Sequence, residues 1–258
     1  MRVFCAVLFS LFLTNPTFGQ ATQFRGTQSS GIAEATDLPI EFDESKNLKW
    51  RCALPGPGSS SPIIVGDRVF VTCFTGYGVD SNAGPNDLVR HLVCTSLASG
   101  EIQWTTPFKT EATPDRYQGY IADHGYASST PATDGERVFV FAGKSGVYAF
   151  DLEGKQLWRT SVGTDSAMNN WGSASSPVVF KRKVLVNASA ESGKFYALNV
   201  EDGEVVWETN ASAAYGSWAT PVMAIGDDGR DEMIVNVPYE VWSLNPENGK
   251  LLWYSEAT

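Results

Sequence analysis

The segment ALNVEDGEVVW (197–207) decides the fold, because its pattern occurs four times in the chain. Each copy has alternating apolar residues, a turn closed by Gly, and a Trp four residues after that Gly. The Trp recurs every 46–54 residues, and a self-similar unit of that length predicts a repeat architecture. The other copies are CTSLASGEIQW (94–104), AFDLEGKQLW (149–158) and SLNPENGKLLW (243–253).

Each repeat divides into four short strands. In the second repeat these are 129–135, 137–143, 146–151 and 155–163, with apolar alternation in the middle pair. The Gly before the Trp suits a tight hairpin, since Gly takes the left-handed φ that such turns need. The pattern therefore predicts an all-β chain, a β-propeller whose blades are four-stranded antiparallel sheets, with four blades present.

One Trp stands at a fixed place in every repeat, and a further Trp precedes the first repeat. A large ring at a constant position favours a blade-to-blade contact over a ligand contact. Each repeat also begins with a Ser-Pro or Thr-Pro pair, which packing at a strand start explains without a nucleophile. The predicted structural docking residues are Trp50, Trp104, Trp158, Trp207 and Trp253.

These marks resemble the docking motif of quinoprotein-dehydrogenase-like propellers, also called PQQ-like repeats. The motif Ala-x-Asp-x-x-x-Gly-x-x-x-Trp is matched best within 197–207, where Asn replaces the Asp. The resemblance covers about residues 46–258. It implies a family that includes quinoprotein alcohol dehydrogenases and the outer-membrane assembly scaffold BamB, with eight blades as the usual number. Residues 23–50 and 124–131 look like a secreted subgroup found in environmental bacteria.

Residues 47–54, NLKWRCAL, read as the last strand of a blade whose first three strands do not precede them. In a closed ring such an orphan strand completes the final blade. With the blade number that the resemblance implies, we expect a truncated eight-bladed ring with four blades and an orphan N-terminal strand. The alternative is a true four-bladed ring, which would leave 47–54 unpaired or add a fifth strand to one blade.

The N-terminus predicts the compartment. A basic start, an apolar run at 3–13 and small residues after it fit a secretory signal peptide at 1–19. The run is too short to span a bilayer. We expect a signal peptide at 1–19, an N-terminal extension at 20–46, a partial propeller domain at 47–258, and an extracytoplasmic protein, periplasmic or secreted, without a membrane span. An uncleaved N-terminal anchor is the alternative.

Composition and motifs argue against several functions. Asp and Glu number 29 against 19 Lys and Arg, so nucleic acid is not an expected partner. The two histidines, His91 and His124, form no zinc or c-type haem motif with cysteines. The vicinal Cys pair and acidic calcium set of quinoprotein alcohol dehydrogenases have no counterpart here. We expect no catalytic residue, no metal and no cofactor, with pyrroloquinoline quinone and calcium as the alternative.

Three cysteines follow the predicted signal peptide: Cys52, Cys73 and Cys94. Aligning the first repeat with the second places Cys73 opposite about Leu92, and Cys94 opposite about Val71. Such a diagonal pair would need distortion to form a disulfide. We therefore expect buried free thiols.

Loops on one rim of the predicted propeller are the candidate binding face. The long insertions 74–91 and 105–127, and the shorter connections 164–174 and 209–218, fall where a propeller places its loops on one face. The alternative is that these rings pack the loops down and His124 caps a backbone group. The binding-face candidates are Asp115, Arg116, Tyr117, Asp123, His124, Tyr126, Asn170, Trp171, Tyr215 and Trp218.

Two functions fit these observations. The first, which we favour, is a non-catalytic propeller that binds a protein or a glycan on this face. The second is a quinone-dependent oxidoreductase of the alcohol or sugar dehydrogenase type, whose ligands lie in further blades. An acidic calcium-ligand set facing the channel would distinguish them.

Overall fold

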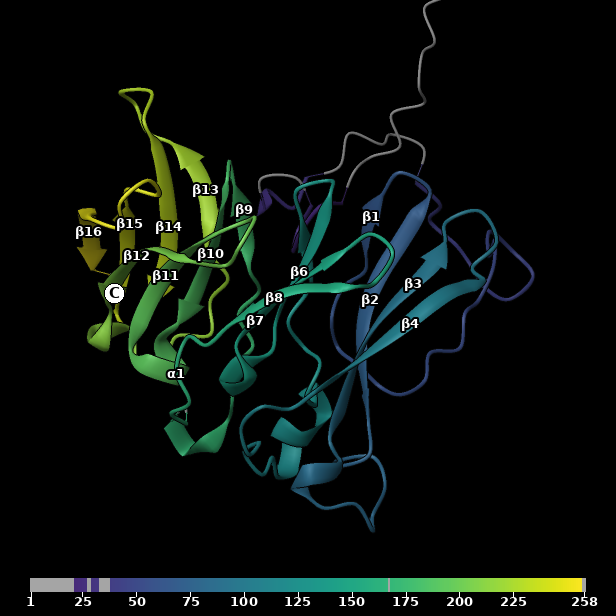
Figure 1. The fold of residues 1–258 in the computed structure, drawn as a ribbon. Helices are drawn as coiled ribbons and strands as arrows, with labels where there is room; N and C mark the ends of the chain where they lie inside the picture. Colours follow the sequence, from purple (N-terminus) through teal and green to yellow (C-terminus); the bar gives the residue numbers. More distant parts are fainter. Residues whose placement is uncertain (1–20, 27–28, 33–37, 167, 257–258) are drawn as a thin grey trace, which may run out of the picture.

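Each repeat folds as one four-stranded antiparallel sheet in the computed structural model, which describes residues 21–26, 29–32, 38–166 and 168–256 (Figure 1). In every sheet the strands pair in chain order, which confirms the predicted propeller blades. Blade one is β1 (Ile63–Val65), β2 (Arg68–Thr75), β3 (Val89–Ser96) and β4 (Ile102–Lys109); blade two is β5 (Ala132–Thr133), β6 (Arg137–Phe141), β7 (Val147–Asp151) and β8 (Gln156–Thr160); blade three is β9 (Val178–Phe180), β10 (Lys183–Ala188), β11 (Lys194–Asn199) and β12 (Val205–Asn210); blade four is β13 (Val222–Ile225), β14 (Asp231–Val237), β15 (Glu240–Leu244) and β16 (Leu251–Glu256).

Short helices occur in the connections. The α-helix α1 (Ser189–Ser192) lies between β10 and β11. Among the described residues, no helix has the length and apolar character needed to cross a bilayer. The predicted signal peptide, 1–19, lies outside the described residues. The 3₁₀ turns are η2 (Pro85–Asp87), η3 (Gly119–His124), η4 (Gly143–Ser145), η5 (Met168–Asn170) and η6 (Ser212–Ala214).

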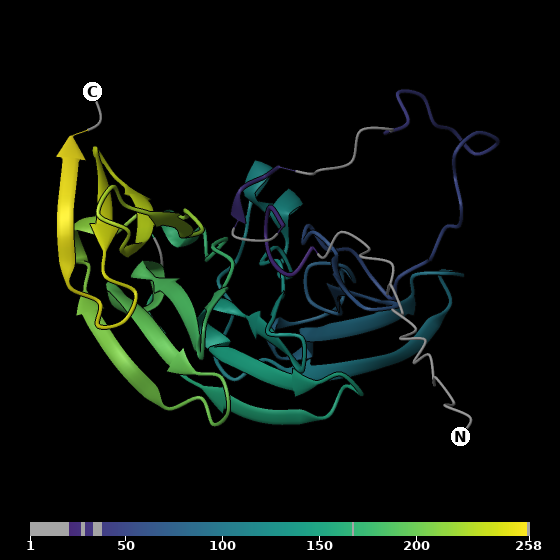
Figure 2. The same cartoon turned by 90° about the horizontal axis from the view of Figure 1, so that it is seen from above.

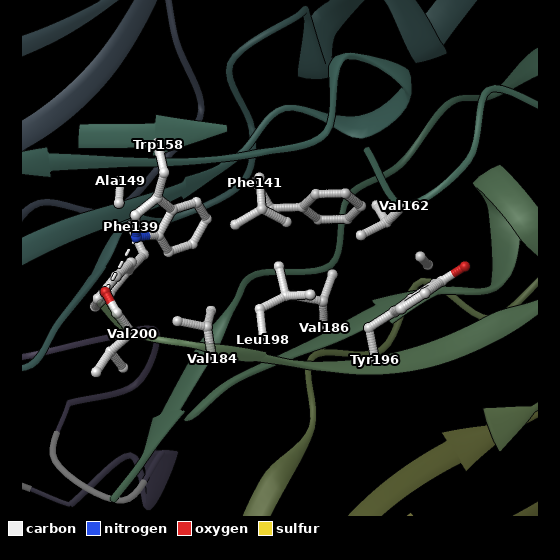
Figure 3. Close-up of a cluster of buried hydrophobic side chains, with 12 residues drawn as sticks. Phe139, Phe141, Ala149, Trp158, Val162, Val184, Val186, Tyr196, Leu198 and Val200 are labelled. Atoms are coloured by element: carbon white, nitrogen blue, oxygen red, sulfur yellow. Dashed lines mark hydrogen bonds between the residues drawn. The ribbon is translucent and has the colours of Figure 1, made fainter. Parts of the chain in front are cut away.

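The hydrophobic core lies between successive blades rather than at one centre. Apolar side chains of neighbouring sheets form one cluster between blades one and two, one between two and three, and one between three and four. In the middle cluster Phe139 and Trp158 of blade two face Val184 and Leu198 of blade three (Figure 3). Seen from above, the four sheets follow one another in an arc that is open in the described part of the chain (Figure 2).

The Gly of each repeat is required by the Trp of the preceding blade. Gly203 has φ +74°, and a Cβ added there would lie 2.5 Å from the ring of Trp158. Gly249 has φ +71° and meets Trp207 at the same distance. Only glycine combines this left-handed backbone with so close an approach. The recurring Gly and Trp are therefore two sides of one contact between blades.

Two hydrogen bonds complete each of these contacts. The Nε1 of Trp158 donates to the carbonyl of Val200 at 3.1 Å, and the hydroxyl of Thr160 donates to that of Gly203 at 2.7 Å. Trp207 and Thr209 make the same pair of bonds to blade four, at 3.0 and 2.7 Å. The Trp and a hydroxyl two residues later thus bind the next blade's last turn.

Residues 47–54 form no strand, yet Trp50 docks on blade one as Trp158 docks on blade three. Its Nε1 donates to the carbonyl of Leu97 at 2.9 Å, and a Cβ on Gly100 would lie 2.5 Å from its ring. Residues 47–54 therefore contact blade one at the position where the fourth strand of the preceding blade contacts each of the other blades.

The first described residues bind the inner strands of three blades. The carbonyls of Ala21 and Thr22 accept hydrogen bonds from the amides of Ile64 and Thr133, both at 2.9 Å. The side-chain oxygen of Gln23 accepts one from the amide of Val179 at 3.0 Å. Residues 21–23 therefore tie blades one, two and three together, a contact that the sequence did not indicate.

The cysteines of blade one are buried and free, but their predicted register is wrong by one residue. Cys73 lies opposite His91, and Cys94 lies opposite Phe70. The side chains of Cys73 and Cys94 therefore point to opposite faces of the sheet. The alignment failed because the last turn of blade one is one residue longer than that of blade two, as the pairs Cys94–Trp104 and Ala149–Trp158 show. In addition, β2 extends to Thr75 and β3 begins at Val89, so the predicted insertion 74–91 is partly strand.

Candidate functional site

The connections between blades gather on one side of the sheets, the lower side of Figure 1, where α1 also lies. We call three of them the rim loops: 110–131 between blades one and two, 161–177 between two and three, and 211–221 between three and four. The predicted insertion 105–127 begins later than expected, because β4 extends to Lys109.

A stack of three rings fixes the first rim loop. Tyr117 lies between Tyr126 and His124, with ring centroids 4.4 and 4.9 Å away. The hydroxyl of Tyr126 donates to the backbone carbonyl of Asp115 at 2.7 Å. Tyr126 is buried and Tyr117 is half-buried. Burial raises the pKa of Tyr117, so its phenol stays neutral. These rings hold the loop in shape.

The second and third rim loops attach to the first through backbone carbonyls. The Nε2 of His124 lies 3.2 Å from the carbonyl oxygen of Trp171, which only accepts, so Nε2 carries the proton. The indole of Trp218 donates to the carbonyl of Gly172 at 2.8 Å and packs 5.5 Å from the Trp171 ring. Burial lowers the pKa of His124, and the ring is neutral near pH 7.

The remaining candidates lie at the surface. Tyr215 is exposed, and its hydroxyl donates to the carbonyl of Ser166 at 3.4 Å. Tyr120, a further ring of the first rim loop, is 72% exposed and packs edge-on against Trp171. The structure thus divides the predicted face into a buried ring framework and an exposed polar and aromatic layer. The exposed predicted residues are Arg116, Asp123, Asn170 and Tyr215.

Behind the rim loops lies a cavity of about 40 Å³ that sequence reasoning missed. Arg90 of β3 lines it and is only 8% exposed. Its Nε donates to the carbonyl of Tyr126 at 2.7 Å, and its Nη1 to the hydroxyl of Thr110 at 3.1 Å. One signal could have found it: Arg90 shares the strand face of Leu92 and Cys94, which pack against blade two.

A lysine and an aspartate pair at the cavity wall. The Nζ of Lys144, on η4, lies 2.7 Å from a carboxylate oxygen of Asp115 and 2.6 Å from the hydroxyl of Ser166. The same hydroxyl donates to Asp115 at 2.7 Å. The side chains of Lys144 and Asp115 are 17% and 9% exposed, so the pair is shielded from water. The carboxylate of Asp115 is therefore paired with the ammonium of Lys144.

Glu191, on α1, is the buried acid of the cavity. It is 2% exposed, and its Oε2 has no hydrogen-bond partner among the described residues. Burial raises the pKa of Glu191 to about 8, with Asp115 adding to the rise and Lys144 opposing it. Glu191 is therefore mostly protonated at neutral pH. Its helix occupies the place in blade three that η4 occupies in blade two.

The described residues do not supply a metal site. Within them, no three His, Cys, Asp or Glu side chains are grouped so that they could hold an ion. Calcium with pyrroloquinoline quinone, the pair implied by the dehydrogenase resemblance, therefore has no ligand set that can be assigned here. Asp115 is already bound to Lys144, and Glu191 is held in its neutral form.

Comparison with known proteins now identifies the family. The family model described as "Outer membrane protein assembly factor BamB" matches residues 83–229, which is more than half of the chain. The chain therefore belongs to this family of PQQ-like β-propellers, as its repeats predicted.

Relatives of known structure share the fold. A quinohemoprotein alcohol dehydrogenase from Comamonas testosteroni has a TM-score of 0.57 and 15% identity, over 93% of this chain and 41% of the dehydrogenase. One from Pseudomonas putida HK5 has a TM-score of 0.52 and 15% identity, over 82% of this chain and 36% of that dehydrogenase.

A curated protein matches by sequence. The tetrathionate hydrolase of Acidithiobacillus ferrooxidans is 24% identical over 239 residues, 84% of this chain and 46% of the hydrolase. The chain spans less than half the length of each.

Proposed function

We propose that this protein acts outside the cytoplasm as a non-catalytic propeller, which binds a protein or a glycan through the exposed layer of its rim loops. The observation that carries the proposal is the joining of three successive connections into one surface. His124 and Trp218 bind the backbone of the loop 161–177, while Arg116, Tyr120 and Tyr215 stay exposed above the framework.

The chemistry of this layer suits macromolecular recognition. Tyr and Arg contribute most strongly to protein interfaces, and aromatic faces with carboxylate and amide groups also suit sugars. Tyr120 and Tyr215 supply the rings, Asp123 and Asn170 the polar groups. Because stacked rings already order the loops beneath, binding would cost little conformational entropy.

The extracytoplasmic location is supported by the sequence at the N-terminus and by the family. The apolar run at 3–13 follows a basic start, which is typical of a secretory signal. The family model carries the description of an outer membrane protein assembly factor. We propose that the mature protein begins near residue 20.

Binding assays with matched variants test the proposal. The full-length protein is assayed against a glycan panel and an extracytoplasmic peptide library, and isotherms are measured for each ligand found. We expect Tyr120→Ser combined with Tyr215→Ser to weaken binding at least tenfold at unchanged Tm. Tyr254→Ser, a change at an exposed Tyr of β16, is the matched control and should bind normally.

Two results would contradict the proposal. Equal affinity of the double variant and the control would show that the rim loops do not bind the ligand. A saturable, calcium-dependent rise of Tm with pyrroloquinoline quinone, accompanied by dye reduction, would favour the oxidoreductase instead.

A further inference from the structure

The cavity behind the rim loops contains a buried positive charge without a matching carboxylate. Arg90 donates to the carbonyl of Tyr126 and to the hydroxyls of Thr110 and Ser145, all neutral oxygens. None of the ion pairs among the described residues includes Arg90. A buried guanidinium is costly unless an anion pairs with it, and Arg keeps its proton in proteins.

The acidic groups that line the cavity do not neutralise Arg90. Asp115 already binds the Lys144 ammonium at 2.7 Å. Asp165 is exposed to solvent at the cavity's edge. Glu191 is mostly neutral near pH 7, because burial raises its pKa to about 8. The positive charge of Arg90 therefore lacks a partner in this part of the structure.

Two further donors in the cavity have no acceptor. The hydroxyl of Ser129 is buried and makes no hydrogen bond among the described residues. The same holds for Oε2 of Glu191, which is a donor when the carboxyl is protonated. Both residues line the cavity with Arg90. A buried donor without an acceptor costs about 1–3 kcal/mol, so these groups require an occupant that accepts hydrogen bonds.

The size of the cavity limits that occupant. Since about 10–15 Å³ of such space holds one water, the cavity of about 40 Å³ has room for about three waters or a small planar ion. It is far smaller than the few hundred Å³ of a pocket for a fused-ring cofactor. Since Nε and Nη1 of Arg90 already donate to protein oxygens, Nη2 is the nitrogen that remains for the occupant. A carboxylate oxygen accepts a hydrogen bond from this charged group more strongly than a neutral acceptor does.

We propose that this cavity is a binding site for a small carboxylate anion of formate or acetate size, held by the guanidinium of Arg90 and by the hydroxyl of Ser129. The site is independent of the exposed layer of the rim loops. The anion would neutralise Arg90 between β3, the first rim loop and η4, which all contribute to the cavity wall.

Thermal melting of the full-length protein in sodium formate tests the site, with formamide as the uncharged molecule of the same shape. We expect a saturable rise of Tm with formate and none with formamide. Arg90→Met should abolish the rise. Ser129→Ala should raise the Kd about tenfold, the loss of one hydrogen bond to a charged group.

Two controls keep the test decisive if Arg90→Met fails to fold. Ser129→Ala should fold normally, since its hydroxyl has no partner to lose. Ser81→Ala, at an exposed serine between β2 and β3, should respond to formate like the wild type. No saturable rise with formate in the wild type, or equal formate affinity in the Ser129→Ala and Ser81→Ala variants, would overturn the proposal.

Discussion

Glu191 should make the protein less stable as the pH rises from acid to mildly alkaline. Its pKa is raised from the ordinary 4.5 to about 8 by burial. Between these values the unfolded chain releases the proton while the folded chain keeps it. The stability that the protonated carboxyl contributes is complete below about 4.5 and is lost progressively up to about 8. At about 1.36 kcal/mol per pH unit, the unfolding free energy lost over this pH interval amounts to about 5 kcal/mol.

Replacement by Gln isolates this contribution, because the amide has the shape of the protonated acid but does not ionise. We expect Glu191→Gln to match the wild type near pH 4.5 and to exceed its unfolding free energy by about 5 kcal/mol at pH 8. Urea unfolding of both proteins at half-unit steps of pH measures the difference, in which other titrating groups cancel. Parallel curves for the two proteins across this range would refute the burial argument.

Three further predictions concern contacts between blades. Trp207→Ala should cost about 3–5 kcal/mol in urea unfolding, since the ring is 8% exposed, whereas Trp171→Ala should cost much less. Gly203→Ala should destabilise more than Gly135→Ala in the same measurement: both have positive φ, but only at Gly203 would the Cβ meet a ring. Residues 20–258 expressed alone should oligomerise in sedimentation velocity through the open sheet edges, and Trp253→Ser should reduce this; a monodisperse wild-type monomer would contradict it.

The blades could be predicted from the sequence because each uses the same local rules. Alternation fixes which side chains face the neighbouring blade, and the paired Gly and Trp recur at constant spacing. The contact between Gly203 and Trp158 joins two blades, yet it leaves its mark in every repeat. A feature repeated four times can be recognised even when its partner lies about 45 residues away.

The cavity could not be predicted because it is not repeated. Arg90 comes from blade one, Lys144 from blade two and Glu191 from blade three, and no spacing in the chain relates them. Glu191 in particular looks like an ordinary surface carboxylate in the sequence. Only the position of α1 against η4 and the second rim loop buries it, which is a tertiary effect.

Trp50 and Trp253 show that the docking contact is asymmetric at the two ends of the arc. Trp50 binds the last turn of blade one, where each of the other blades is bound by the Trp of the preceding blade. Trp253, in contrast, is 42% exposed, and its indole donates to Glu232 of its own blade at 2.9 Å. Ser255 repeats the hydroxyl that Thr209 uses on blade four. Blade four therefore presents the Ser255 hydroxyl at this edge, whereas the Trp253 indole is already used within its own blade.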